Sequence, residues 1–296
     1  MPLSLSPRSP AVRAAAWCLA ALVWPAAAAA QGSAQQVYAI VVDGDGFPVR
    51  GLSAEDFSLR DGAVRQAVQG AEAATNPVWF AVVVRGFSTE DAPHVRRAIE
   101  AIVKAASQGP SGSRVGVMRP TSTGAAEWVD VTPQLPEATW TSVVENSGRS
   151  VLDAIGDAAS ALRRAPTDRR AIVTLIKRSP GEAHVVQNAL VTDQLFNAGA
   201  SLWTIELPGS AGSTGPPPAA NAVKLDDVLN DATKFSGSLR ERVTDAAAMA
   251  PMAERVANLV LAQYVVTYLW PNPMLSQFSI ATRHDRGDVL VPAWAR

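Results

Sequence analysis

The sequence contains a single cysteine, Cys18, which lies within the first thirty residues. Residues 1–30 have the composition of a secretory signal peptide. Arg8 and Arg13 come first, a short apolar stretch follows, and Ala28-Ala29-Ala30 supplies small residues for cleavage. The apolar stretch is shorter than the roughly 20 residues that a membrane-spanning helix needs. We therefore predict a signal peptide, with an uncleaved anchor as the alternative, and a secreted chain, periplasmic or extracellular, without disulfides.

A charge excess of either sign is also missing. The chain has 26 Lys and Arg against 27 Asp and Glu. Removal of residues 1–30, which carry two arginines and no acid, leaves 24 and 27, a net charge of −3. A near-neutral balance argues against a dedicated nucleic-acid or membrane-surface binder. The remaining 266 residues (296 minus 30) suit one large α/β domain, alone or with a small β module.

The local motifs of common enzymes and metal sites are absent too. The sequence has neither a Gly-x-Ser-x-Gly elbow nor a phosphate-binding P-loop. Its three histidines, His94, His184 and His284, lack metal-ligand spacing. The stretch Asp43-Gly44-Asp45-Gly46 lacks the 12-residue calcium pattern and is typical of a hairpin turn. We predict no catalytic residue, no metal and no cofactor.

Strand patterning occupies both ends of the chain after the signal peptide. Near the N-terminus, a β-branched run over 37–42 is followed by turn residues and further short strands up to about residue 70. Strand patterning returns over 264–291. We predict an N-terminal β segment over 31–76 and a C-terminal one over 263–296, which together form a small β module.

Between these segments, unbroken apolar strands alternate with amphipathic helices. The buried strand 78–84 is followed by helical spacing over 95–103, and the same alternation continues beyond it. Such alternation favours a doubly wound, mostly parallel sheet with helices on both faces. We predict this α/β domain over 77–262, interrupted by a low-complexity, exposed loop over 208–222.

Four blocks of the sequence, in this order, resemble one family. They are 41–57 with the turn Asp61-Gly62, the strand 78–84 with its loop, the strand 170–176, and 263–269 with Pro271 and Phe278. The blocks are similar to those of bacterial von Willebrand factor type A-related proteins of the acidobacterial type. The resemblance implies a von Willebrand factor A-like α/β domain. It also implies a metal-ion-dependent adhesion site, formed by three loops at the carboxyl end of the sheet.

This chain departs from the family pattern in all three of those loops. The Asp-x-Ser-x-Ser loop falls on Arg85, Phe87 and Thr89, the threonine position falls on Arg149, and the last aspartate falls on Lys177-Arg178. Hard divalent cations need several oxygen ligands, usually with carboxylates among them. The resemblance therefore implies a degenerate adhesion site without metal.

The cationic replacements predict a different use of the same face. The residues expected at this mouth are Arg85, Thr89, Arg149, Ser150, Lys177 and Arg178. Guanidinium groups bind carboxylates as a bidentate fork, so we predict a non-enzymatic module that binds another protein through an acidic residue. Two alternatives stay open: an enzyme acting on an anionic substrate with His184 as acid–base residue, and a structural module with no ligand there.

Overall fold

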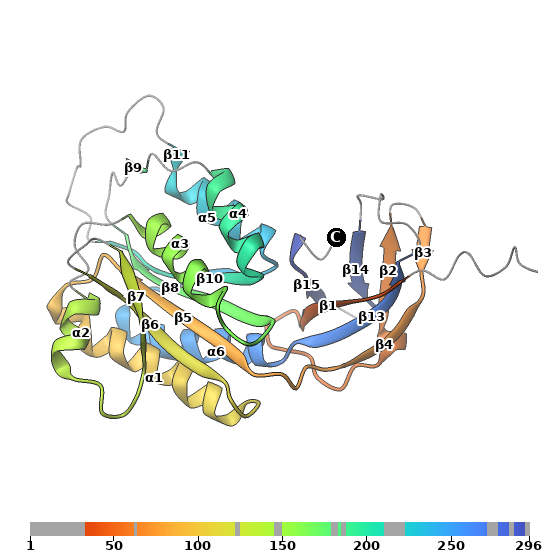
Figure 1. Cartoon of the computed structure of the whole chain (residues 1–296), viewed down its shortest axis with the longest axis horizontal. Coiled ribbons are helices and arrows are strands. Elements are labelled where there is room, and N and C mark those ends of the chain that lie inside the picture. The colour runs from red at the N-terminus through yellow and green to blue at the C-terminus, as the bar shows by residue number, and fades with distance from the viewer. Residues whose placement is uncertain are drawn as a thin grey trace, which may run out of the picture.

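The computed structural model describes residues 33–61, 64–121, 125–144, 150–178, 183–184, 188–209, 223–270, 278–283 and 287–293. Figure 1 shows an α/β unit beside a unit made of strands alone. The predicted signal peptide, Arg149 and nearly all of the low-complexity loop lie outside the described residues. Within the described residues, no helix is long and apolar enough to cross a membrane.

The α/β unit contains a six-stranded sheet in the order β12-β10-β8-β5-β6-β7. Its strands are β5 (Val78–Arg85), β6 (Arg114–Pro120), β7 (Ala126–Asp130), β8 (Arg169–Lys177), β10 (Ala200–Leu207) and β12 (Arg240–Arg242). All neighbours are parallel except β7, which pairs antiparallel with β6. Numbered among themselves in chain order, these strands follow the doubly wound order 3-2-1-4-5-6. The predicted fold class is confirmed.

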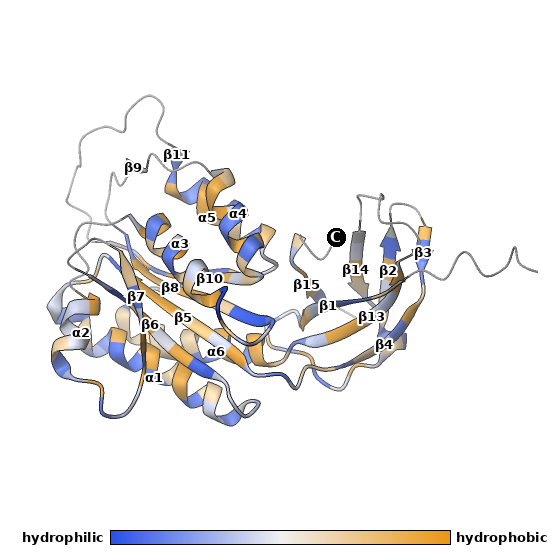
Figure 2. Cartoon of the chain, in the orientation of Figure 1, coloured by the Kyte–Doolittle hydropathy of each residue, from blue (hydrophilic) through white to orange (hydrophobic). Residues whose placement is uncertain are grey.

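Three helices cover each face of this sheet (Figure 1). One face carries α1 (Ala92–Gln108), α2 (Glu137–Val144) and α6 (Met249–Leu261), and the other carries α3 (Val151–Leu162), α4 (Asn188–Ala198) and α5 (Leu225–Phe235). Alternate residues of β5 enter the two cores: Val82 belongs to the first and Val83 to the second. Both faces are buried, which explains why the central strands are mostly apolar (Figure 2). The short helix α2 is an element that the sequence pattern did not predict.

Three single 3-10 turns and a short pair of strands complete the described part of the chain. The turn η1 (Ala54–Asp56) lies between β1 and β2, and the α/β unit holds η2 (Thr89–Asp91), η3 (Ala246–Ala248), β9 (Ala183–His184) and β11 (Val223–Lys224). The two short strands pair antiparallel with each other.

The second unit is built from strands of both ends of the chain, as predicted. A four-stranded sheet has the order β15-β1-β13-β4 and a three-stranded sheet the order β14-β2-β3. The strands are β1 (Ser33–Val42), β2 (Phe57–Asp61), β3 (Val64–Gln66), β4 (Val68–Ala73), β13 (Tyr264–Trp270), β14 (Phe278–Thr282) and β15 (Asp288–Leu290). The two sheets share one apolar core, so this unit is a small β sandwich.

Strand β1 contributes to the cores of both units. Val37, Ala39 and Val41 belong to the sandwich core, whereas Ile40 and Val42 belong to the core between the central sheet and helices α1, α2 and α6. Successive side chains of a strand point to opposite sides, so one strand serves two cores. The sandwich therefore packs against the α/β unit through buried side chains.

Candidate functional site

The parallel strands β5, β8, β10 and β12 end at one edge of the central sheet. The register places Arg85 beside Ile176, Lys177 beside Leu207, and Glu206 beside Arg242. The strand order reverses between β5 and β8, and ligands of doubly wound sheets bind in the crevice at that point. This carboxyl edge, where Arg85, Lys177 and Arg178 come together, is the first candidate site.

The loop after β5 lies directly on the end of β8. Gly86 has a φ of +82°, and a Cβ at this position would lie 2.1 Å from the carbonyl oxygen of Lys177. The next residue, Phe87, is buried in the core beneath helix α1. The loop is thus anchored by an aromatic side chain where the family pattern has a serine. Backbone, rather than open space, fills this part of the crevice between β5 and β8.

Lys177 forms an ion pair within the chain. Its Nζ lies 2.7 Å from Oδ2 of Asp91 in the turn η2, and the two side chains are only 24% and 13% exposed. The backbone N–H and the hydroxyl of Ser88 also donate to this oxygen, each over 2.9 Å. Burial alone would raise the pKa of Asp91, but the hydrogen bonds from Lys177 and Ser88 outweigh it and lower the pKa. The ammonium of Lys177 therefore already has a carboxylate partner.

Arg178 belongs to a second group of charges, at the ends of β8, β10 and β12. It lies 2.8 Å from Asp226 in the first turn of α5. Asp226 also accepts from Arg240, whose Nε donates to Glu206 over 2.7 Å. Burial tends to raise the pKa of Asp226, but hydrogen bonds from Arg240 and Arg178 lower it below the usual value. The buried pair of Arg240 and Glu206 anchors this group to the sheet.

The fifth member of this group is Arg242, and it differs from the others in exposure. Its side chain is 68% exposed, and its nitrogens lie 3.4 Å from Glu206 and 3.7 Å from Asp226. Glu206, by contrast, is 1% exposed, and its Oε2 accepts no hydrogen bond from the described residues. We call Arg178, Glu206, Asp226, Arg240 and Arg242 the edge cluster. Three guanidinium groups here surround two carboxylates, so the edge cluster carries one surplus positive charge.

The other predicted site residues have the following positions. Arg85 is half-buried at the end of β5, and Thr89 is exposed in η2. Ser150 caps α3, where its hydroxyl accepts from the backbone N–H of Asp153 over 3.1 Å. Arg149 lies outside the described residues, and so does the side chain of His184. No group of three or more His, Cys, Asp or Glu residues suited to hold a metal occurs in the described part of the chain.

Sequence reasoning missed the acidic partners of this edge and the exposed Arg242. Asp91 precedes Lys177 by 86 residues, and Asp226 follows Arg178 by 48. At such separations, local periodicity carries no signal for a pair. Asp226 lies in the first turn of α5, where the helix dipole favours a negative charge, so its position alone does not reveal that it pairs with arginines.

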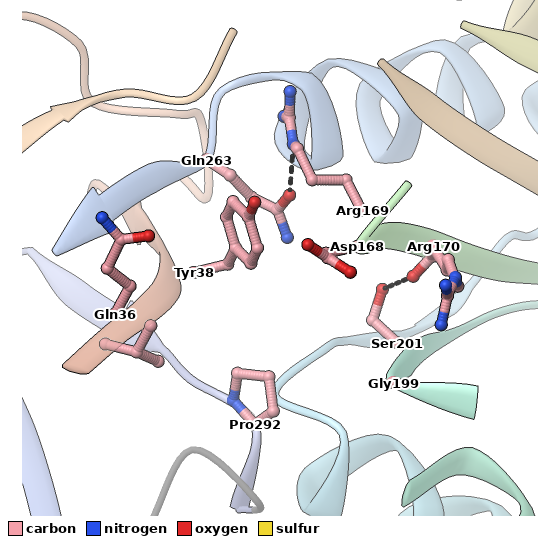
Figure 3. A pocket seen from close by; sticks show the side chains of 10 residues that line it. Gln36, Tyr38, Asp168, Arg169, Arg170, Gly199, Ser201, Gln263 and Pro292 are labelled. Carbon is pink, nitrogen blue, oxygen red and sulfur yellow. Dashed lines mark hydrogen bonds between the residues drawn. The ribbon is translucent and has the colours of Figure 1, made fainter. Parts of the chain in front are cut away.

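A second candidate lies at the opposite, amino end of the sheet. A cavity of about 240 Å³ opens there between the sandwich and the α/β unit. It is lined by Gln36, Val37, Tyr38, Asp168, Arg169, Arg170, Gly199, Ser201, Gln263 and Pro292. Figure 3 shows the carboxylate of Asp168 turned into this space and the guanidinium of Arg169 turned away from it. Its small volume suits ordered water better than a drug-sized molecule.

The chain matches no protein-family model and no curated protein sequence. It is similar to several solved structures. An aerotolerance-related membrane protein from Bacteroides fragilis is 17% identical, over 61% of this chain and 98% of that one, with a TM-score of 0.40. The protein BatB from Bacteroides thetaiotaomicron is 15% identical, over 62% and 98%, with a TM-score of 0.39.

A third similar structure is proximal thread matrix protein 1 from the mussel byssus. It is 8% identical, over 64% of this chain and 49% of that one, with a TM-score of 0.43. Likenesses at these TM-scores carry no weight for family or function. The fold class of this chain rests instead on its own strand order and on the helices that cover both faces of its sheet.

Proposed function

We propose that this protein is a secreted, non-enzymatic binding module related to von Willebrand factor A domains. Its partner is another protein, which presents an acidic residue to the carboxyl edge of the central sheet. The proposal rests on one observation: the edge cluster has three guanidinium groups for two carboxylates, and the exposed one, Arg242, holds its partners only at 3.4 and 3.7 Å.

Ion pairs within the chain decide which cations of the carboxyl edge are available to contact a partner. Lys177 is engaged by Asp91, and Arg240 is nearly buried against Glu206 and Asp226. Arg242 retains donor groups that face solvent, and Arg178 lies beside it around the shared carboxylate of Asp226. A guanidinium gives a carboxylate two parallel hydrogen bonds, so the exposed guanidinium of Arg242 is the group that would receive an acidic side chain of a partner. Arg85, Thr89, Arg149 and Ser150 remain predicted contacts around this position.

The test uses acidic peptides as defined probes. We expect the wild-type protein to bind a glutamate-rich peptide, and not its glutamine counterpart, with an affinity that falls as salt is added. Charge reversal by Arg242→Glu should weaken binding at least about tenfold, because it replaces attraction by repulsion. The control is Arg164→Glu, an exposed arginine after α3 at the other end of the sheet.

Two results would contradict the proposal. Equal binding by the Arg242→Glu and Arg164→Glu proteins would remove the edge cluster from the binding site. Binding abolished by a chelator would show that a divalent cation carries the contact, against the metal-free prediction.

The structural alternative also has an observation in its favour. The backbone of Gly86 lies against the carbonyl of Lys177, and the ion pair of Lys177 with Asp91 joins η2 to the end of β8. The protein itself therefore fills part of the crevice between β5 and β8. If no acidic probe binds at any salt concentration, a purely structural role for this edge is the better description.

A further inference from the structure

Arg169 is a buried cation at the amino end of β8, far along the sheet from the edge cluster. Its side chain is 1% exposed. In the sequence it stands in the polar stretch Thr167-Asp168-Arg169-Arg170, which is typical of a solvated turn. Figure 3 shows its side chain turned toward Gln263, away from the cavity into which Asp168 points. A buried charge is costly unless hydrogen bonds satisfy it, so its partners are informative.

The guanidinium of Arg169 uses all five of its N–H groups. They donate to Oε1 of Gln263 (3.0 Å) and to the carbonyl oxygens of Ala74 (3.0 Å), Asn76 (2.6 Å), Val260 (2.9 Å) and Leu261 (3.2 Å). Each of these acceptors is a neutral oxygen. Burial lowers the pKa of Arg169 to about 10, which still leaves the group charged at neutral pH. Two of the carbonyls belong to the last turn of α6, where a cation is favoured by the helix dipole.

Three of these acceptors lie on the two connections between the units, and the other two are in the last turn of α6. The chain passes from the sandwich to the α/β unit between β4 and β5, the segment that contains Ala74 and Asn76. It returns between α6 and β13, at Gln263. The two connections also bind each other, since the N–H of Ala74 donates to the carbonyl of Gln263 over 2.8 Å. One guanidinium from β8 therefore holds both connections.

We propose that Arg169 fixes the sandwich to the α/β unit at a rigid joint, formed by the two connections that it binds. Because of this joint, the two units unfold together. This role is independent of the binding function proposed above, because the joint lies at the opposite end of the sheet. Loss of the Arg169 side chain is therefore expected to uncouple the unfolding transitions of the two units, while both units can still fold.

The test follows each unit by its own probe during thermal unfolding. All three tyrosines, Tyr38, Tyr264 and Tyr268, are in strands of the sandwich, so fluorotyrosine labelling and ¹⁹F NMR report on that unit. Helices α1 to α6 all belong to the α/β unit, so circular dichroism at the helix band reports on the other. We expect coincident midpoints in the wild-type protein. In Arg169→Met the two midpoints should separate by about 5 °C or more.

The matched control is the neighbouring arginine. Arg170 also donates to two carbonyls, of Ala198 (2.7 Å) and Ala165 (3.0 Å), but both lie within the α/β unit. Arg170→Met should therefore lower the midpoints of both probes together. Coincident midpoints in Arg169→Met, or a separation of equal size in Arg170→Met, would overturn the proposal.

A second variant keeps the proposal testable if Arg169→Met fails to fold. Gln263→Glu gives the buried guanidinium a carboxylate partner at the position where Oε1 already accepts its Nε–H. The present hydrogen bond has a charged donor and a neutral acceptor, and a carboxylate acceptor turns it into an ion pair. We expect Gln263→Glu to raise the coincident midpoints. A lower midpoint, or separated midpoints, in this variant would count against the joint.

Discussion

At the scale of single residues, the charges of the carboxyl edge are mostly paired inside the chain. The sequence has cations at the positions where the family pattern that it resembles has acidic or hydroxyl groups, and it predicts a cationic mouth. The structure adds the acids: Asp91 for Lys177, and Asp226 for Arg178. Within the edge cluster, the surplus positive charge is most exposed at Arg242, which is the contact that we propose for a partner.

The lowered pKa of Asp91 makes stability depend on acid pH. A carboxyl whose pKa is lower in the folded than in the unfolded protein stabilises the fold above its unfolded pKa, near 4. That stability is lost as the pH falls through the folded pKa. Asp91→Asn should lower the free energy of unfolding at pH 7 by about 1 to 3 kcal/mol. Urea unfolding between pH 7 and 3 should also show a shallower acid loss in the variant; an identical pH profile would contradict the pairing.

Gly86 tests the contact between the β5 loop and β8. A non-glycine residue with a left-handed backbone costs about 1 to 3 kcal/mol. We expect Gly86→Ala to lower the free energy of unfolding by more than this. The excess arises because the new Cβ would meet the carbonyl oxygen of Lys177. Gly51→Ala is the matched control, since its φ of +79° is similar and nothing lies within 4 Å of its Cβ position. Equal losses in the two variants, measured by urea unfolding, would mean that the close approach carries no cost.

At the scale of elements, β1 is the strand that joins two cores. Its alternation puts Val37, Ala39 and Val41 into the sandwich and Ile40 and Val42 against the α/β unit. Local patterning shows an apolar strand here, but the unbroken run does not reveal that its two faces serve different units. The sequence therefore predicts the strand β1, and only the fold shows that this strand packs into the cores of both units.

Truncation of the side chain that crosses this boundary should be costly. Ile40→Ala is expected to lower the free energy of unfolding by about 2 to 5 kcal/mol, because it leaves a cavity in the core of the α/β unit. Leu269→Ala, on the neighbouring strand β13, is the control, since that side chain is 37% exposed. A similarly small loss for both variants in chemical denaturation would show that β1 does not pack into this core.

At the scale of the whole molecule, the sandwich and the α/β unit form one body. Strand β1 buries side chains in both cores, and Arg169 binds both connections between the units. The edge cluster lies at the end of the sheet away from this joint. Binding at the carboxyl edge is therefore expected to leave the arrangement of the two units unchanged.

Separation of the units is expected to damage the α/β unit. A fragment of residues 77–262 would lose Ile40 and Val42 from its core and the acceptors Ala74, Asn76 and Gln263 from Arg169. We expect such a fragment to bind a hydrophobic dye and to unfold at a lower temperature than the chain with both units. A fragment with the stability of the whole chain would contradict the dependence of this unit on the sandwich.

The sequence by itself determined the architecture, because local patterns encode it. Unbroken apolar runs that alternate with amphipathic helices predict a doubly wound sheet, and strand patterns at both ends predict the β module. Helix α2 was not predicted, since its eight residues span little more than two turns and give no clear helical period. The tertiary structure alone decided the chemistry of the candidate site and the joint. Lys177 meets Asp91, and Arg169 meets Ala74 and Val260, only after residues 86 to 95 positions apart have been brought together. Only these contacts decide whether a charge is paired, buried or left for a partner.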